Sequence, residues 1–155
     1  MEHRNRMELS MSETEAVPFR ILPKLTDANR EFWQAGEVGE LRFWRCQDCA
    51  QYIHPPQPIC PMCHGKNLRV EPVSGRATLT TYSINYQAWM PGPELPYCVA
   101  IIEIVEDPRV RLTTNIVNCA HDALVIGMPL RVVFEHHADA DGDVWIPLFE
   151  PEVKP

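Results

Sequence analysis

Alternation of apolar and polar side chains dominates the second half of the chain. In residues 109–117, every second side chain is apolar or small and the side chains between them are polar: Val110, Leu112, Thr114 and Ile116 against Arg109, Arg111, Thr113 and Asn115. A period of two is that of a β-strand with one face toward a core. Runs rich in β-branched and aromatic residues also occupy 76–87, 97–106, 129–136 and 144–149. The pattern therefore predicts five strands.

The segments between these strands are of unequal length. A proline-rich loop, residues 88–96 with Trp89 at its tip, follows the first strand, and an irregular or helical crossover, residues 118–128, precedes the fourth. A short acidic turn, residues 138–143, joins the last two strands. Five strands connected in this way are typical of the oligonucleotide/oligosaccharide-binding (OB) barrel.

The first half of the chain predicts one helix, over residues 26–38. Thr26 or Asp27 is suited to cap its start, and two glycines lie near its end. Phe32 and Trp33 fall in its middle. Two interpretations of this aromatic pair stay open: packing against a neighbouring element, or lining a surface for a ligand or partner protein.

Two pairs of cysteines predict a metal site. Cys46 and Cys49 are separated by two residues, as are Cys60 and Cys63, and ten residues lie between the pairs. Two tight turns with this spacing direct four sulfurs to one point, as a tetrahedral zinc ion requires. Disulfides and a redox CxxC fit less well, and a rubredoxin-like iron site stays open. Four thiolates leave no open coordination position, so we expect a structural Zn²⁺ ion.

The strand that leads into the first cysteine pair mixes basic and aromatic side chains. Residues 40–45 read ELRFWR, with Arg42, Trp44 and Arg45 among them. Such a set can hold a phosphate and a flat ring together, or the arginine stems can simply cover aromatic rings. His54 and His64 lie close to the cysteines, and we expect both to be exposed and not to bind the metal.

Charge and composition exclude several classes of function. The chain has a net charge of −7, and residues 74–155 carry five basic and eleven acidic side chains, a net charge of −6. A groove for nucleic acid needs the opposite sign, which argues against a single-stranded nucleic-acid-binding protein. No apolar run approaches the roughly 20 residues of a membrane span. The polar residues 1–17 predict disorder without a signal core, and thiols in metal-type spacing indicate the cytoplasm.

The predicted organisation is mainly β: an N-terminal helix, a rubredoxin-like four-Cys zinc ribbon and a C-terminal five-stranded OB-fold barrel. Its segments are a disordered or extended stretch over 1–23, helix and ribbon over 24–73, barrel over 74–151 and a tail over 152–155. Cys98 and Cys119 lack basic neighbours in sequence, so we expect buried, inert thiols. The sequence has no nucleophile elbow and no phosphate-binding glycine loop. We therefore expect no catalysis by this chain alone.

Several strings in this order resemble those of the zinc-ribbon/OB-fold proteins associated with acyl-CoA metabolism. The similarity covers about residues 20–151. The strings are Phe32-Trp33, LRFWRCQDC over 41–49, Pro55-Pro56, Cys60-Pro61-Met62-Cys63, Val73-Ser74-Gly75-Arg76, Pro96-Tyr97, IGMPL over 126–130 and Phe149-Glu150-Pro151. Two positions depart from the family pattern, because Ala50 and His64 stand where glycine commonly follows the second thiol of each pair.

The resemblance implies an accessory role. Such proteins accompany a thiolase-like or aldolase subunit that cleaves acyl-CoA thioesters by thiolysis or by a retro-aldol reaction, with sterol side chains and aromatic-degradation intermediates among the substrates. Others accompany a hot-dog-fold enoyl-CoA hydratase, which is the alternative. The partner supplies the catalytic residues in a hetero-oligomer. Any contact with CoA or the partner is expected from basic and aromatic groups near the ribbon: Phe32, Trp33, Arg42, Trp44, Arg45 and Arg76.

Overall fold

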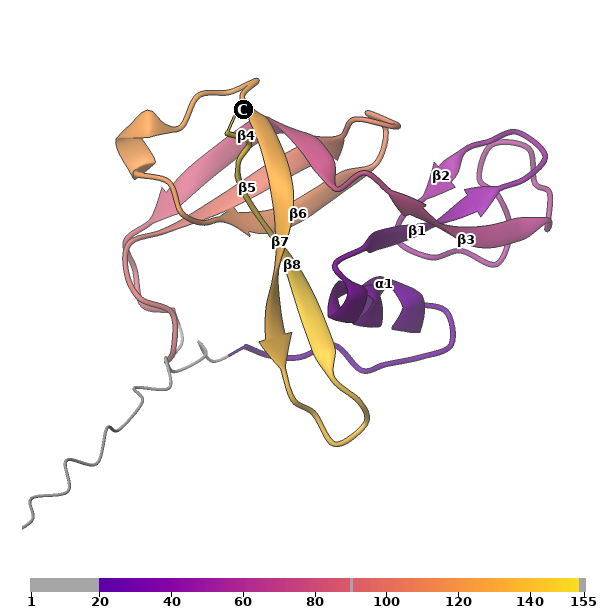
Figure 1. Cartoon of the computed structure of the whole chain (residues 1–155), viewed down its shortest axis with the longest axis horizontal. Helices are drawn as coiled ribbons and strands as arrows, with labels where there is room; N and C mark the ends of the chain where they lie inside the picture. The colour runs from indigo at the N-terminus through magenta and orange to yellow at the C-terminus, as the bar shows by residue number, and fades with distance from the viewer. Residues whose placement is uncertain (1–19, 90, 154–155) are drawn as a thin grey trace, which may run out of the picture.

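The computed structural model describes residues 20–89 and 91–153. The predicted disorder of residues 1–17 lies outside the described residues, as do Pro18 and the last two residues of the predicted tail. Figure 1 shows two β-structures side by side, a small sheet and a larger barrel, with a short helix between them.

The N-terminal helix is shorter than the predicted 26–38. Helix α1 spans Arg30–Gln34 and continues as the 3₁₀ helix η1, Ala35–Val38. The predicted cap at Thr26 or Asp27 is wrong, because Asn29 is the N-cap residue and its Oδ1 accepts a hydrogen bond from the Thr26 amide at 2.8 Å. Residues 26–29 therefore form a turn before the helix begins. Gly39, with φ of 74°, ends the helix in the left-handed conformation.

The small sheet contains three antiparallel strands. Strand β1, Leu41–Cys46, lies in the centre between β2, Tyr52–Ile53, and β3, Leu68–Val73. Strand β1 matches the strand predicted over residues 40–45, whereas the two-residue β2 lies between the cysteine pairs, where no strand was predicted. The first cysteine pair follows at the end of β1, and the second lies between β2 and β3.

The barrel contains the five predicted strands. They are β4, Arg76–Asn85; β5, Tyr97–Ile104; β6, Arg111–Ile116; β7, Pro129–His137; and β8, Val144–Pro151. The 3₁₀ helix η2, His121–Ala123, lies in the crossover before β7. The closed order is β4-β5-β6-β8-β7, which is the OB-fold topology. Strands β6 and β8 run parallel and meet through one registered pair, Ile116 and Phe149, so the barrel is least continuous there.

One apolar core joins the barrel to the helix and the small sheet. The predicted inward face of β6 is confirmed, since Val110, Leu112, Thr114 and Ile116 are all buried. Phe32 of α1 and Phe43 of β1 belong to the same buried cluster as the barrel strands. Helix and ribbon are therefore packed onto the barrel rather than tethered to it. None of the helices in the described part of the chain has the length and apolar character needed to cross a membrane.

Candidate functional site

The four cysteines form one cluster at the tips of two turns. The sulfur atoms of Cys46, Cys49, Cys60 and Cys63 all lie within 4.8 Å of one another. The Sγ atoms of Cys46 and Cys63 are 3.5 Å apart, as are those of Cys49 and Cys60. A zinc ion with Zn–S bonds of about 2.3 Å requires sulfurs about 3.8 Å apart in a tetrahedron. The residues present fit a structural zinc ion, which would hold the two turns together.

The two turns repeat one backbone geometry. The amide of Ala50 donates to the Cys46 carbonyl at 2.9 Å, and the amide of His64 donates to the Cys60 carbonyl at 3.0 Å. Ala50 and His64 adopt positive φ angles of 62° and 60°. The two departures from glycine thus occupy the left-handed positions where glycine is least strained. The turn geometry is formed despite these side chains.

Backbone amides stabilise the thiolate form of one ligand. The Cys63 and Met62 amides hydrogen-bond to the Cys60 sulfur and lower the pKa of the Cys60 thiol to about 7. Because only a thiolate binds the metal, these amides favour the ligand form of Cys60. By contrast, the pKa values of the Cys49 and Cys63 thiols are raised among the crowded sulfurs, so metal binding must displace their protons.

Phe32 belongs to the core and not to the surface. Its side chain is 7% exposed, and its ring centroid lies 5.6 Å from that of Phe43. The His54 ring packs against both phenylalanines, at 4.9 Å and 5.4 Å. The prediction that His54 is exposed is therefore wrong; it is half-buried, and burial lowers its pKa. Trp33 meets Phe32 edge to face at 4.7 Å and is half-buried.

Arg42 and Trp44 lie together on one face of β1. They line a surface hollow of about 520 Å³ beside Glu31 and Glu40. The Arg42 guanidinium pairs with Glu31 at 2.8 Å and with Glu40 at 2.7 Å. The Trp44 Nε1 group donates to the Ala28 carbonyl at 2.8 Å, which fixes the indole against the turn before α1. The Arg42 guanidinium is thus already paired with two carboxylates of the chain itself.

The other two arginines on the predicted list are also paired. Arg45 contacts Glu71 at 2.9 Å and lies 5.2 Å from the centre of the Tyr52 ring. Arg76, on the barrel, makes two hydrogen bonds with Glu152 at 2.8 Å and 3.0 Å. These partners raise the pKa of each guanidinium. The structure brings Arg42 and Trp44 together but does not gather all six predicted residues into one site.

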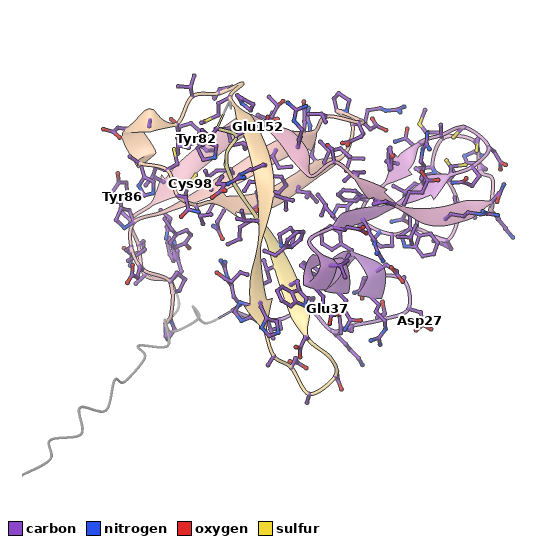
Figure 2. All side chains as sticks on the ribbon, in the orientation of Figure 1. Asp27, Glu37, Tyr82, Tyr86, Cys98 and Glu152 are labelled. Atoms are coloured by element: carbon purple, nitrogen blue, oxygen red, sulfur yellow. The ribbon has the colours of Figure 1, made fainter. Side chains whose placement is uncertain are left out.

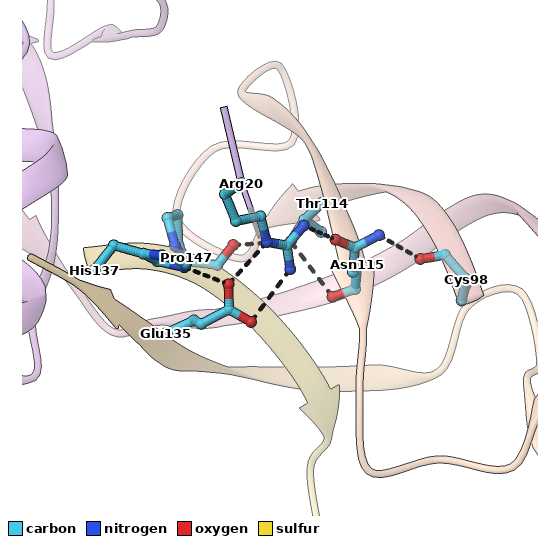
Figure 3. Close-up of polar contacts among 7 residues, drawn as sticks. All are labelled: Arg20, Cys98, Thr114, Asn115, Glu135, His137 and Pro147. Atoms are coloured by element: carbon cyan, nitrogen blue, oxygen red, sulfur yellow. Dashed lines mark hydrogen bonds and ion pairs between the residues drawn. The ribbon is translucent and has the colours of Figure 1, made fainter. Parts of the chain in front are cut away.

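A polar cluster that the sequence did not indicate joins side chains of β6 and β7 (Figure 3). Arg20 donates to Glu135 at 2.8 Å and to the Asn115 Oδ1 atom at 2.8 Å. His137 lies 2.7 Å from the same carboxylate. Arg20 and Glu135 form part of the wall of a cleft of about 600 Å³. Since Arg20 and Glu135 are 115 residues apart, no local motif could have revealed this contact.

Comparison with known proteins places this architecture in a family. A family model described as the ChsH2 rubredoxin-like zinc ribbon domain matches residues 33–69, and one described as the ChsH2 C-terminal OB-fold domain matches residues 70–135. The chain belongs to the ChsH2 family of zinc-ribbon/OB-fold proteins. This assignment accounts for both the cysteine cluster and the five-stranded barrel.

Relatives within this family carry different functional names. A probable enoyl-CoA hydratase alpha subunit of Thermomonospora curvata is 33% identical over 143 residues, which is 91% of this chain and 43% of that protein. A DUF35 domain-containing scaffold protein of Methanocaldococcus jannaschii is 34% identical over 72% of this chain and 78% of its own length. The benzoylsuccinyl-CoA thiolase subunit BbsA of Thauera aromatica is 32% identical over 48% of this chain and 51% of its own length. The chain thus spans less than half of the hydratase relative.

Two solved structures share the fold. A chain of the Ltp2-ChsH2(DUF35) aldolase superimposes with a TM-score of 0.72 and 31% identity, covering 85% of this chain and all of that one. A DUF35-family protein from Sulfolobus solfataricus has a TM-score of 0.58 at 14% identity, covering 81% of this chain and 86% of that one, and shows the fold alone.

Proposed function

We propose that this chain is a scaffold subunit, without catalysis of its own, that binds and supports a thiolase- or aldolase-type subunit acting on acyl-CoA thioesters. The observation that carries the proposal is the similarity to a chain of the Ltp2-ChsH2(DUF35) aldolase, which this chain covers completely. The relative named as a benzoylsuccinyl-CoA thiolase subunit supports the same class of partner. The partner's reaction is thiolysis or retro-aldol cleavage, and the complex acts in the cytoplasm.

The chemistry of the cysteine cluster supports a scaffolding role. Four cysteine sulfurs within 4.8 Å of one another satisfy a tetrahedral ion completely, which leaves no position for a substrate. The ion would therefore stabilise the ribbon and take no part in bond cleavage.

Arg42 and Trp44 are the best placed of the six predicted contact residues. They share one hollow beside α1, whereas Phe32 is buried and Arg76 lies on the barrel. We propose that this hollow contacts the partner or the nucleotide part of CoA. A phosphate there would have to replace Glu31 or Glu40 as the partner of Arg42, so we expect a modest contribution to affinity. Trp33, Arg45 and Arg76 are secondary candidates.

A second candidate is the accessory role in an enoyl-CoA hydratase. The hydratase alpha subunit of Thermomonospora curvata matches 91% of this chain, and a 3-oxo-4,17-pregnadiene-20-carboxyl-CoA hydratase alpha subunit of Mycobacterium tuberculosis is 27% identical over 75% of it. Both relatives are more than twice as long as the matched region, since the match covers 43% and 36% of their lengths. In this case the partner would be a hydratase subunit of hot-dog fold.

Reconstitution of activity tests the proposal. The purified chain, a thiolase-type subunit from the same organism, and the mixture of both are assayed for acyl-CoA thiolysis and retro-aldol cleavage. We expect no turnover by the chain alone, and a higher or more stable activity in the mixture than in the partner alone. Thioester cleavage by the chain alone would contradict a scaffold role. A gain seen only with a hydratase subunit would favour the second candidate.

A further inference from the structure

The segment between β4 and β5 exposes two aromatic side chains and a leucine. Trp89 is 78% exposed and Tyr86 is 74% exposed, and Leu95 near the end of the loop is 41% exposed. Figure 2 shows Tyr86 at the outer edge of the barrel, on the side away from the ribbon. Exposed apolar patches on a protein surface often mark interaction sites. Tryptophan and tyrosine are also enriched among the residues that contribute most to binding at protein interfaces.

Hydrogen bonds hold Trp89 in this outward position. Its Nε1 group donates to the Asn85 side chain at 2.9 Å, and the Asn85 Nδ2 group donates to the Gln87 carbonyl at 2.7 Å. The Trp89 amide also donates to the Gln87 carbonyl, at 3.1 Å. Because the indole is already oriented, a partner that covers it loses little conformational entropy on binding.

The cleft beside this loop has the form of a docking site. Pro93, Glu94 and Pro96 at the base of the loop line the 600 Å³ cleft together with Ile21, which is 75% exposed. Arg20 and Glu135, two of its charged wall residues, neutralise each other. Glu94 is exposed, and among residues 20–89 and 91–153 it makes no ion pair. The rim therefore presents an apolar surface with a surplus negative charge.

We propose that Tyr86, Trp89 and Leu95, with the adjoining cleft, form the surface that docks the thiolase- or aldolase-type subunit. We name this surface, the three side chains together with the cleft, the aromatic loop. The inference rests on the proposed function and names the contact. The partner presents an apolar projection that enters the cleft, flanked by a lysine or arginine that pairs with Glu94. A second copy of this chain is the poorer occupant, because two aromatic loops would bring two unpaired Glu94 carboxylates together.

Affinity measurements with the zinc-loaded chain and the co-expressed thiolase-type subunit test this inference. Trp89→Ala is expected to weaken the complex by at least about 30-fold, as for a central interface tryptophan. Glu94→Lys is expected to slow association and to reduce its dependence on salt concentration. Val38→Ala is the matched control, because Val38 is 65% exposed on η1 and lies outside the aromatic loop. Circular dichroism and zinc content confirm that each variant is folded.

The outcomes separate the docking surface from the proposed function. If the wild-type chain binds its partner and Trp89→Ala binds equally well, the aromatic loop is not the docking surface, although the scaffold role stands. An equal loss for Val38→Ala would likewise overturn the assignment. If the wild-type chain alone forms a dimer that Trp89→Ala converts to a monomer, the occupant is a second copy. If the wild-type chain binds no thiolase-, aldolase- or hydratase-type subunit, the proposed function itself fails.

Discussion

The side chain of Gln51 in the zinc ribbon is hydrogen-bonded to the buried carboxylate of Asp107 in the barrel. The Gln51 Nε2 atom lies 3.1 Å from the Asp107 Oδ2 atom. Asp107 is 4% exposed, and its oxygens also accept hydrogen bonds from the Arg109 side chain at 2.8 Å and 3.0 Å. Gln51 follows the first cysteine turn by two residues. The turn that binds metal is therefore joined directly to the β5–β6 connection of the barrel.

Replacement of Asp107 tests this junction. Asp107→Ala leaves the buried Gln51 amide and the Arg109 guanidinium without their common acceptor, so we expect a loss of roughly 1–3 kcal/mol in the free energy of unfolding. Urea denaturation of the zinc-loaded chain measures the loss. Asp141→Ala, at an exposed turn residue, is the control and should change the free energy by less than about 0.5 kcal/mol. Equal stabilities of the two variants would show that the junction contributes nothing.

The metal is expected to stabilise the ribbon and not the barrel. One zinc ion per chain should be found by elemental analysis, and chelation should release the ribbon amides to hydrogen exchange while the barrel strands stay protected. A structural zinc site contributes about 10–16 kcal/mol of apparent binding free energy, more than so small a sheet can replace. Cys60→Ser should lose the ion, whereas Cys119→Ser, outside the cluster, should retain it. Iron in place of zinc would give strong visible absorption.

Arg20 is expected to stabilise the polar cluster that joins side chains of β6 and β7. Arg20→Ala removes the guanidinium that joins Glu135 to Asn115 and leaves a carboxylate that is only 16% exposed with His137 as its remaining partner. Since Arg20 is itself partly exposed, we expect a cost of about 1–2 kcal/mol in the free energy of unfolding. Thermal unfolding of this variant is compared with that of Lys24→Ala. Identical melting temperatures would contradict the role assigned to Arg20.

Acid should weaken the barrel through Glu150. The Asn118 amide, and then the Arg131 guanidinium, lower the pKa of the Glu150 carboxyl below its usual 4.5. A carboxyl with a depressed folded-state pKa contributes its full stability above its unfolded pKa and loses it as the pH falls through the folded value. The difference in unfolding free energy between wild type and Glu150→Gln should therefore be constant from about pH 6 to 8 and shrink below about pH 4.5. A difference that does not change with pH would rule out this ionisation as its source.

Features set by neighbouring residues were predictable from the sequence, and features set by distant contacts were not. The strands follow from alternation, as in residues 109–117, and the metal cluster follows from the spacing of Cys46, Cys49, Cys60 and Cys63. By contrast, the His54 ring is half-buried because it packs against Phe32 and Phe43 of the core. The charge on Arg76 is balanced by Glu152, 76 residues away. Spacing along the chain does not reveal so distant a partner, so Arg76 was predicted to be available for an anion.

Native mass spectrometry of the chain co-expressed with a thiolase-type subunit from the same organism tests the central claim most directly. We expect a hetero-oligomer with about equal numbers of the two subunits and one zinc ion in each copy of this chain. A chain that stays monomeric and binds none of the thiolase-, aldolase- and hydratase-type subunits tested would contradict the scaffold role.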